Sequence, residues 1–345
     1  MRSREDEQRL LGAGKIPSEL LARLLAELPP PPPELRLGAR IGEDACAFEV
    51  SEGVIVAAAD PITLTSEEAG RLAVLVNAND VAVCGATPRW FLSVVLVPPD
   101  STDVLVERLF RSIRLALQEI GAYLVGGHTE VTPAVTRPVV VGQMLGTAEG
   151  GIVTTGGFEP GEMVVQVRPA PIEGASVLAR EASGLDGLEP ALLAEARSAL
   201  ERPGVSVVEP ALLARDLGAT ALHDPTEGGL AGGLHELAAA AGHRIVVDRE
   251  AVLWFSPGVA VCEALGADPW STLASGTLLA TFPPAAVHDA LAALTEQGHP
   301  AAVIGRVEDG QGVEDASREP IEWAEQDEVA RLLSAESADD HRGTI

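Results

Sequence analysis

The segment Asn77-Ala-Asn-Asp-Val-Ala-Val-Cys-Gly-Ala-Thr-Pro88 is mostly apolar, but it carries polar side chains with helical spacing. Asn77 lies three residues before Asp80, and Asp80 lies four before Cys84, so the three side chains share one helical face. An ionised carboxylate among apolar side chains is costly unless it is paired or binds a metal ion. A glycine followed closely by a proline is a usual helix end. The segment therefore predicts a buried helix whose acid either serves a functional site or caps a neighbouring loop.

Four further motifs place acids or glycines where strands end or helices begin. They are Gly42-Glu-Asp-Ala45, Asp60-Pro-Ile-Thr63, Gly126-Gly-His-Thr-Glu-Val-Thr132 and His223-Asp-Pro-Thr-Glu-Gly-Gly229. Mg²⁺ prefers oxygen ligands and usually binds one or two carboxylates together with substrate phosphates. Glycines let the backbone approach phosphate oxygens. The motifs taken together therefore predict a site for Mg²⁺ and a nucleoside triphosphate.

The order of these motifs resembles the superfamily of aminoimidazole ribonucleotide synthetase. That superfamily also holds formylglycinamidine ribonucleotide synthetase, thiamine monophosphate kinase, selenophosphate synthetase and the hydrogenase maturation factor HypE. The resemblance extends over residues 12–310 and is strongest to HypE-like proteins, in His223–Ala231, His235–Leu237, Cys262–Gly266 and Ala302–Val307. It implies an α/β (α+β) fold of the PurM/HypE type, with two domains that each contain a mixed sheet packed with helices.

We expect four segments along the chain: residues 1–35, 36–150, 151–310 and 311–345. The first holds a glycine-containing stretch, a helix over 16–28 and the proline spacer Pro29–Pro33. The second is the ATP-binding domain, the third is the other domain of this type, and the last is an acidic tail with a helix near 324–335. Apolar periodicity predicts helices over 66–85 and 102–120, and strands near 45–50, 53–59, 90–97, 122–126 and 137–146.

Composition limits the classes of partner. With 345 residues the chain is long enough for two domains. Its net charge of −27 disfavours nucleic acid and anionic membranes as partners. The simplest explanation of this charge is an acidic surface that keeps the protein soluble. Three cysteines without a CxxC motif fit a reducing compartment. With no signal core and no apolar run of ~18 residues, we expect a cytoplasmic protein without a membrane partner.

The resemblance also assigns roles to individual residues. It implies that Mg²⁺ and the ATP phosphates are held by four acids, Asp44, Asp60, Asp80 and Asp224. It implies further contacts to the nucleotide from Asn77, Gly126, Gly127, Thr129 and Gly228. The catalytic groups that it implies are Asp80, His128 and Lys15.

Three of these assignments have alternatives. His128 stands where relatives commonly have Asp, and because imidazole suits Mg²⁺ poorly we expect it to contact phosphate or substrate, or to transfer a proton; the alternative is a structural histidine. Gly12-Ala-Gly-Lys15 resembles a mobile segment that places Lys15 on the phosphates, or it is an ordinary terminus. Gly228-Gly229 permits either anion binding at a helix N-terminus or close helix packing.

We expect an ATP-dependent enzyme that phosphorylates an amide-like or carbonyl oxygen and so turns it into a leaving group. The acceptor is a small molecule or a protein thiol, and the resemblance implies a homodimer. HypE proteins carry a C-terminal cysteine that this sequence lacks, since Cys262 is its last, and Ala274-Ser-Gly-Thr277 stands in place of an Asn-Glu-Gly segment. One alternative is HypE-type hydrogenase maturation that acts on a partner's thiol. The other is a non-enzymatic nucleotide-binding scaffold.

Overall fold

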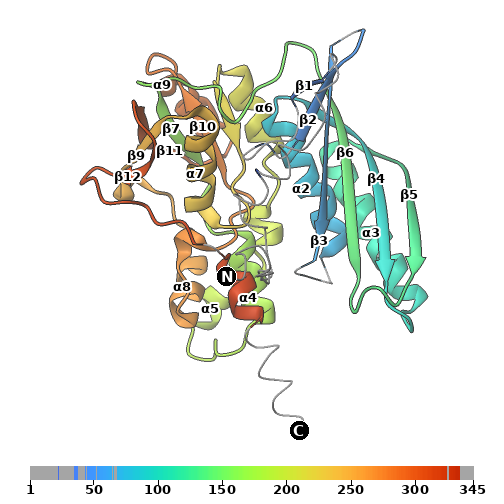
Figure 1. The fold of residues 1–345 in the computed structure, drawn as a ribbon. Helices are drawn as coiled ribbons and strands as arrows, with labels where there is room; N and C mark the ends of the chain where they lie inside the picture. The colour runs from blue at the N-terminus through green and yellow to red at the C-terminus, as the bar shows by residue number, and fades with distance from the viewer. Residues whose placement is uncertain are drawn as a thin grey trace, which may run out of the picture.

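The computed structural model describes residues 22, 35–37, 43, 45–51, 53–63, 65, 68–324 and 326–334. These residues form two six-stranded mixed sheets, each packed with helices (Figure 1). The expected fold class is therefore confirmed. Lys15, Asp44, the proline spacer and nearly all of the expected helix over 16–28 lie outside the described residues.

The first sheet has the strand order β1-β2-β3-β6-β4-β5. Its strands are β1 (Leu35–Leu37), β2 (Ala45–Glu49), β3 (Val54–Ile62), β4 (Thr87–Val97), β5 (Tyr123–Val131) and β6 (Val139–Ala148). Helix α3 (Asp103–Ile120) connects β4 to β5, which pair in parallel as such a crossover requires. Thr102 caps α3 by accepting from the Leu105 N–H, and Gly121 ends it in the left-handed conformation. The helix predicted over 102–120 is confirmed.

Helix α2 (Ala69–Val83) is the helix that the Asn77–Pro88 segment predicted, and it is buried on all sides. A helix that is apolar all round belongs inside a protein. One side of α2 packs on β3 and β6, and another contacts α6 of the second half. The glycines of β6 allow the close approach, because a Cβ on Gly142 would lie 2.4 Å from Asn77 Nδ2 and one on Gly146 would lie 2.4 Å from Val81 Cγ1.

The second sheet has the order β12-β9-β11-β7-β10-β8. Its strands are β7 (Met163–Val167), β8 (Ala221–His223), β9 (Arg244–Val247), β10 (Leu278–Phe282), β11 (Ala301–Glu308) and β12 (Gly312–Asp315). Its helices are α4 (Glu173–Glu181), α5 (Pro190–Arg197), α6 (Val208–Asp216), α7 (Gly229–Ala241), α8 (Ser256–Leu265) and α9 (Val287–Glu296). Leu72 of α2 and Leu222 of β8 belong to one buried cluster, so the two halves share a core. Within the described ranges, no helix is long and apolar enough to cross a bilayer.

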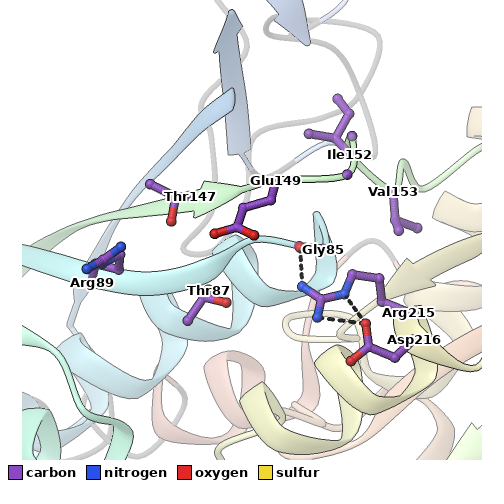
Figure 2. Close-up of a pocket in the computed structure, with 11 residues that line it drawn as sticks. Gly85, Thr87, Arg89, Thr147, Glu149, Ile152, Val153, Arg215 and Asp216 are labelled. Atoms are coloured by element: carbon purple, nitrogen blue, oxygen red, sulfur yellow. Dashed lines mark hydrogen bonds and ion pairs between the residues drawn. The ribbon is translucent and has the colours of Figure 1, made fainter. Parts of the chain in front are cut away.

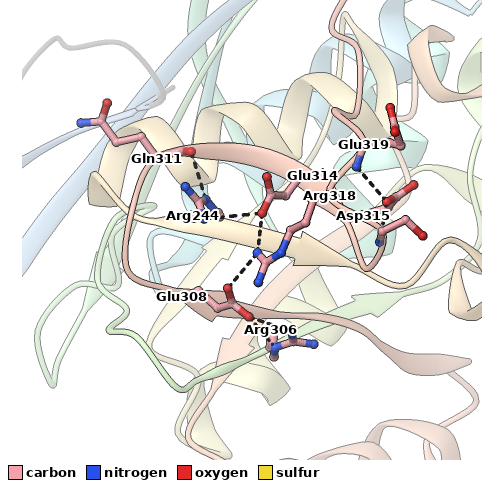
Figure 3. A network of polar contacts seen from close by, with 9 residues as sticks. Arg244, Arg306, Glu308, Gln311, Glu314, Asp315, Arg318 and Glu319 are labelled. Atoms are coloured by element: carbon pink, nitrogen blue, oxygen red, sulfur yellow. Dashed lines mark hydrogen bonds and ion pairs between the residues drawn. The ribbon is translucent and has the colours of Figure 1, made fainter.

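Strand β12 lies in the segment that we expected to be part of an acidic tail, so the ordered sheet extends beyond residue 311. The four residues of β12 are too few to show the alternation of apolar and polar side chains from which a strand is predicted. Arg318 pairs with Glu308 and Glu314, and Arg244 also lies 3.5 Å from Glu314 (Figure 3). Exposed ion pairs contribute little stability individually, but charges at a sheet edge discourage pairing with other strands. Residues 328–334 are helical, within the helix expected near 324–335.

Candidate functional site

A row of paired residues crosses the first sheet at the level of Asp60. Asp60 pairs with Gly142, Gly142 with Ser93, and Ser93 with Gly127. Residues paired in register point to the same face of a sheet. A Cβ on Gly142 would meet Asn77 of α2, so this is the face that α2 covers. Asp60 therefore points toward the helix that carries Asn77 and Asp80.

Asn77 holds Asp60 in place through the backbone. The fully buried Asn77 amide accepts from the Asp60 N–H at 2.8 Å and donates to Asp60 O at 3.3 Å and Ala73 O at 2.8 Å. Both amide protons are thus used within the chain. The nucleotide contact that we expected from Asn77 stays a prediction, and what this geometry shows is a residue that fixes the end of β3 against α2.

Asp80 and Asp224 approach the seam between the two halves from opposite sides. Asp80 lies on α2 and is 2% exposed, whereas Asp224 directly follows β8 and is 1% exposed. Helix α2 contacts β8, so the two acidic segments are neighbours. The turn after β8 is fixed by a 2.8 Å contact between His223 Nε2 and Glu236 Oε2. This arrangement brings carboxylates from both halves to one seam.

The donor set of this site suits a cation that arrives with a nucleotide. Asp60, Asp80 and Asp224 offer carboxylate oxygens, which are the ligands that Mg²⁺ prefers. Across the described part of the chain, no three or more metal-binding side chains form a group that could hold a metal ion. Mg²⁺ does not require such a group, since it usually takes one or two carboxylates and fills its other positions with phosphate oxygens and water. The residues therefore fit Mg–ATP better than a permanent metal centre.

The Gly126–Thr129 segment differs from the expected strand end and turn. All four residues lie inside β5, which continues to Val131 and is exposed along its length. Gly127 is needed there because a Cβ would lie 2.1 Å from Ser93 O of the neighbouring strand. The motif was interpreted as a turn because glycine pairs usually indicate one, whereas here they permit close strand packing.

His128 lies on the other face of the sheet from Asp60. It pairs with Val94, one position beyond the row that contains Gly127, and neighbouring positions on a strand alternate in direction. Its side chain is 67% exposed, and Nε2 lies 3.7 Å from Glu130 Oε2. Within one chain, the sheet therefore separates His128 from Asp60 and α2. Thr129 points to the same face as Asp60, but β5 lies three strands from β3, so the two residues are about 14 Å apart across the sheet.

The N-terminus of α7 is covered by the C-terminal segment of the same chain. Asp327 Oδ2 accepts from the Gly228 N–H at 2.9 Å, and Oδ1 accepts from the Val329 N–H at 2.8 Å. A Cβ on Gly228 would lie 3.0 Å from Trp323 Nε1. A carboxylate at a helix N-terminus is stabilised by the free backbone N–H groups there. Asp327 was not predicted from the sequence, because its partner lies 99 residues away.

Two buried acids in the second half have strongly raised pKa values. Burial raises the pKa of Glu173 to about 7; the nearby Glu227 charge also raises it, and a hydrogen bond with Ser275 opposes the shift. Burial likewise raises the pKa of Asp327 to about 7, with Glu227 and Glu173 adding to the effect. Glu173 therefore places a carboxyl group beside Ser275, in the segment where the sequence indicated the loss of a carboxylate.

Glu173 predicts how stability depends on pH. Because the folded protein keeps this proton to a pH of about 7, and the unfolded chain loses it near 4.5, the folded state binds more protons between these values. The free energy of unfolding therefore falls as pH rises through this window. We expect Glu173→Gln to reduce this decrease in the free energy of unfolding, by at most about 3 kcal/mol. Urea unfolding at several pH values measures it. Glu107→Gln, on the exposed side of α3, is the control, and identical pH profiles for wild type and Glu173→Gln would contradict the assignment.

A cavity of ≈ 650 Å³ opens at the seam beyond the C-terminal end of α2 (Figure 2). It is lined by Gly85, Thr87, Arg89, Thr147, Glu149, Gly150, Gly151, Ile152, Val153, Arg215 and Asp216. Thr147 pairs with Ile55, five residues before Asp60 on β3, which places it about 17 Å from the Asp60 row. Arg215 Nη1 donates to Gly85 O at 2.8 Å and closes the end of α2. The cavity thus lies apart from the Asp60 row.

Known proteins resemble the chain over both halves. Residues 42–148 match the N-terminal domain model of AIR synthase related proteins, and residues 159–316 match the C-terminal domain model. The carbamoyl dehydratase HypE of Escherichia coli (strain K12) is 32% identical over 285 residues, which cover 78% of this chain and 78% of that protein. A selenide, water dikinase of Nitratidesulfovibrio vulgaris is 29% identical over 347 residues, covering 87% of this chain and 94% of that protein.

The fold also agrees with solved structures. The hydrogenase maturation protein HypE in complex with ATP superimposes with a TM-score of 0.69 at 24% identity, covering 92% of this chain and 98% of that one. Two PurM-like domains joined in this order are therefore common to this chain and that ATP-binding structure.

Proposed function

This chain belongs to the AIR synthase related protein family, and from that premise we propose that it is an enzyme that uses Mg–ATP to phosphorylate an amide-like or carbonyl oxygen. The observation that carries the proposal is the contact between α2, which holds buried Asp80, and β8, which buried Asp224 directly follows, with Asp60 on the sheet face toward α2. Carboxylate oxygens are the ligands that Mg²⁺ prefers, and a magnesium nucleotide would bring the cation to them.

The acids act together in this proposal. Asp60 and Asp80 would hold the cation that accompanies the phosphates, and the Asn77 amide keeps the Asp60 backbone in register with α2. Asp224 would add a carboxylate from the second half to the same Mg–ATP site. When bound, Mg–ATP supplies the phosphoryl group and offsets the charge that spreads over its oxygens during transfer. Burial of the seam excludes water, so the acceptor oxygen is the nucleophile that reaches the phosphorus.

The remaining assignments form part of the same proposal. We assign nucleotide binding to residues 36–150, with contacts from Gly126, Gly127 and Thr129 of β5, and the acceptor side to residues 151–310. Gly228, whose N–H donates to Asp327, would also contact the nucleotide. Asp44 and Lys15 keep the roles that their motifs predict, as a cation ligand and a phosphate contact.

We further propose a homodimer formed through the face of the first sheet that no described helix covers. Helices α2 and α3 contact this sheet, and the strand residues that alternate with the buried ones are mostly apolar and only half buried. On β4 these are Leu92, Val94 and Leu96. A sheet face exposed to water is usually polar, so an apolar face indicates a missing partner. The same face carries His128, which would then contact the partner subunit or a ligand at the interface.

A dimer formed through this face should dissociate when a charged side chain is placed on the face. We expect Val94→Lys to shift the protein from dimer to monomer in sedimentation velocity, because a lysine would be buried between two apolar faces without a partner. Val104→Lys on α3, where the side chain is 65% exposed, is the matched control and should leave the mass unchanged. A Val94→Lys protein that sediments like wild type would exclude this interface.

An ATP-consumption screen tests the proposed activity. The purified protein is incubated with Mg–ATP and a metabolite library, and release of ADP or phosphate is measured against Asp44→Ala. The proposal expects at least one acceptor to increase ATP consumption in the wild type alone. ATP binding without consumption across the library would favour the non-enzymatic scaffold.

HypE-type maturation is the second candidate, favoured by the identity to HypE over most of the chain. The thiol that it needs would come from another protein. Burial raises the pKa of the Cys262 thiol to about 11, Cys84 is buried in the core, and burial also raises the pKa of Cys46. Thiols with raised pKa values are poor nucleophiles. ATP consumption that requires a cysteine-bearing partner, and that stops when the partner is alkylated, would establish this candidate over the small-molecule acceptor.

A further inference from the structure

Asn79 joins the first half of the molecule to the second through its side chain. It lies on α2 directly before Asp80 and is fully buried. Its Nδ2 donates to Val205 O at 2.9 Å, and its Oδ1 accepts from the Val207 N–H at 2.8 Å. One side-chain amide thus bonds to a backbone carbonyl and a backbone N–H of the second half, which lie 126 and 128 residues further along the chain.

Asn77 and Asn79 lie on the same turn of α2 but hydrogen-bond to different halves of the molecule. Asn77 bonds to the backbone of Asp60 in the first sheet, whereas Asn79 bonds to the 205–207 segment of the second half. Asp80 follows directly. Because both amides are fully buried and bonded, this turn of α2 is fixed against each half at once.

Arg168 holds the other side of the 205–207 segment. Its guanidinium is 6% exposed and donates to Ser206 O at 2.6 Å, Gly204 O at 2.5 Å and Pro203 O. Burial lowers the pKa of Arg168 to about 10, which still leaves it charged at neutral pH. A buried cation whose described contacts are backbone carbonyls is suited to fixing a loop, because five donors in a rigid fork restrain several carbonyls together.

The same strand end leads to Asp224. Gln166 on β7 pairs with Leu279 on β10, and Leu279 pairs with His223 on β8. Strands β7 and β8 run in the same direction, so Arg168 and Asp224 leave the sheet at the same edge, about 10 Å apart across two strand spacings. The contacts run from Asn79, next to Asp80, through residues 203–207 to Arg168, which lies about 10 Å from Asp224 at the same end of the sheet.

We infer that Asn79 and Arg168 are positioning residues that hold Asp80 of the first half against Asp224 of the second. The inference rests on the proposed function, since it assigns these residues to the geometry of that site. We call Asn79, residues 203–207 and Arg168 the inter-half clamp. The clamp predicts that nucleotide binding to the first half slows hydrogen exchange at backbone amides of the second half.

Asn79→Leu tests the clamp because it keeps the side-chain size and removes both hydrogen bonds. We expect ATP turnover to fall about 10- to 100-fold, as for other small displacements of reacting groups, while Kd for Mg–ATP changes less than about threefold. In hydrogen exchange, Mg–ATP should protect the amides of residues 205–207 and 224–229 in the wild type but not in the variant. Arg168→Lys should reduce turnover in the same way, and the double variant should be no worse than the worse single one.

Thr281→Val is the matched control. Thr281 is also fully buried, and its hydroxyl accepts from the Ala221 N–H at 3.0 Å within the second half. Valine keeps the shape of the side chain and removes this hydrogen bond, so the control should lose thermal stability but retain turnover within about threefold. Equal loss of turnover in Asn79→Leu and Thr281→Val would overturn the clamp, because both would then act through stability alone.

Thermal unfolding separates failure of the clamp from failure of the proposed function. If the wild type binds no Mg–ATP, the proposed function fails, and the clamp is judged by calorimetric unfolding instead. The clamp expects a lower transition temperature for Asn79→Leu than for the wild type, since two buried hydrogen bonds between the halves are lost. Transitions at similar temperatures in both proteins would overturn it.

Discussion

Asp80→Asn should lower ATP turnover about 100-fold or more, as removal of a charged group that stabilises a transition state commonly does. Asparagine has nearly the same shape, so the packing of α2 is kept and the lost quantity is the negative charge. Asp80 is 2% exposed, and a buried charge of this kind interacts strongly with a bound cation. The measurement is steady-state ATP consumption with the acceptor found in the screen, supported by circular dichroism to confirm the fold.

Asp103→Asn is the control for Asp80→Asn. Asp103 lies exposed in the first turn of α3, where its carboxylate accepts from the Val104 N–H. Its substitution should leave turnover within about twofold, because exposed charges away from a site act weakly on it. Turnover of Asp80→Asn at the wild-type level would remove α2 from the active site altogether.

Gly142→Ala should destabilise the protein where α2 packs on the first sheet. The added Cβ would lie 2.4 Å from Asn77 Nδ2 and 2.5 Å from Ala73 O, where helix and sheet meet. Overpacking of this kind costs about 1–3 kcal/mol. Because Asn77 is displaced and holds Asp60, we also expect Kd for Mg–ATP to rise. Urea unfolding and calorimetry measure the two effects on the same preparation.

Gly150→Ala is the matched control for Gly142→Ala. No heavy atom lies within 4 Å of a Cβ on Gly150, and its backbone does not require glycine. The free energy of unfolding should change by less than about 0.5 kcal/mol. If Gly142→Ala were as stable as Gly150→Ala and bound Mg–ATP normally, α2 would not pack on β6 in the way described.

The parts of the fold that could be predicted are those with local signals. The Asn77–Pro88 spacing predicted α2, and the apolar periodicity over 102–120 bounded α3 to within a residue. The apolar pattern also predicted most strands of the first sheet. These features depend on residues a few positions apart, where helical and strand periods act directly.

The parts that could not be predicted depend on pairing across long distances in the sequence. The face on which His128 lies follows from the register of β5 with β4, and a one-residue shift would move the side chain to the other face. Glu173 and Ser275 meet although about a hundred residues separate them, so the sequence indicated a lost carboxylate where the fold provides another. Asn79 stood within the predicted motif, but its partners at Val205 and Val207 could be found only from the fold.

Calorimetric titration of the full chain with ATP, in Mg²⁺ and again in excess EDTA, measures whether these acids bind a magnesium nucleotide. We expect saturable binding with one nucleotide per chain in Mg²⁺, at least about tenfold weaker in EDTA, because carboxylates and phosphates then repel one another without a cation. Asp80→Asn should reduce the dependence on Mg²⁺. Absence of binding, or equal affinity with and without Mg²⁺ in both proteins, would contradict the claim that the acids of α2 and the seam form a Mg–ATP site.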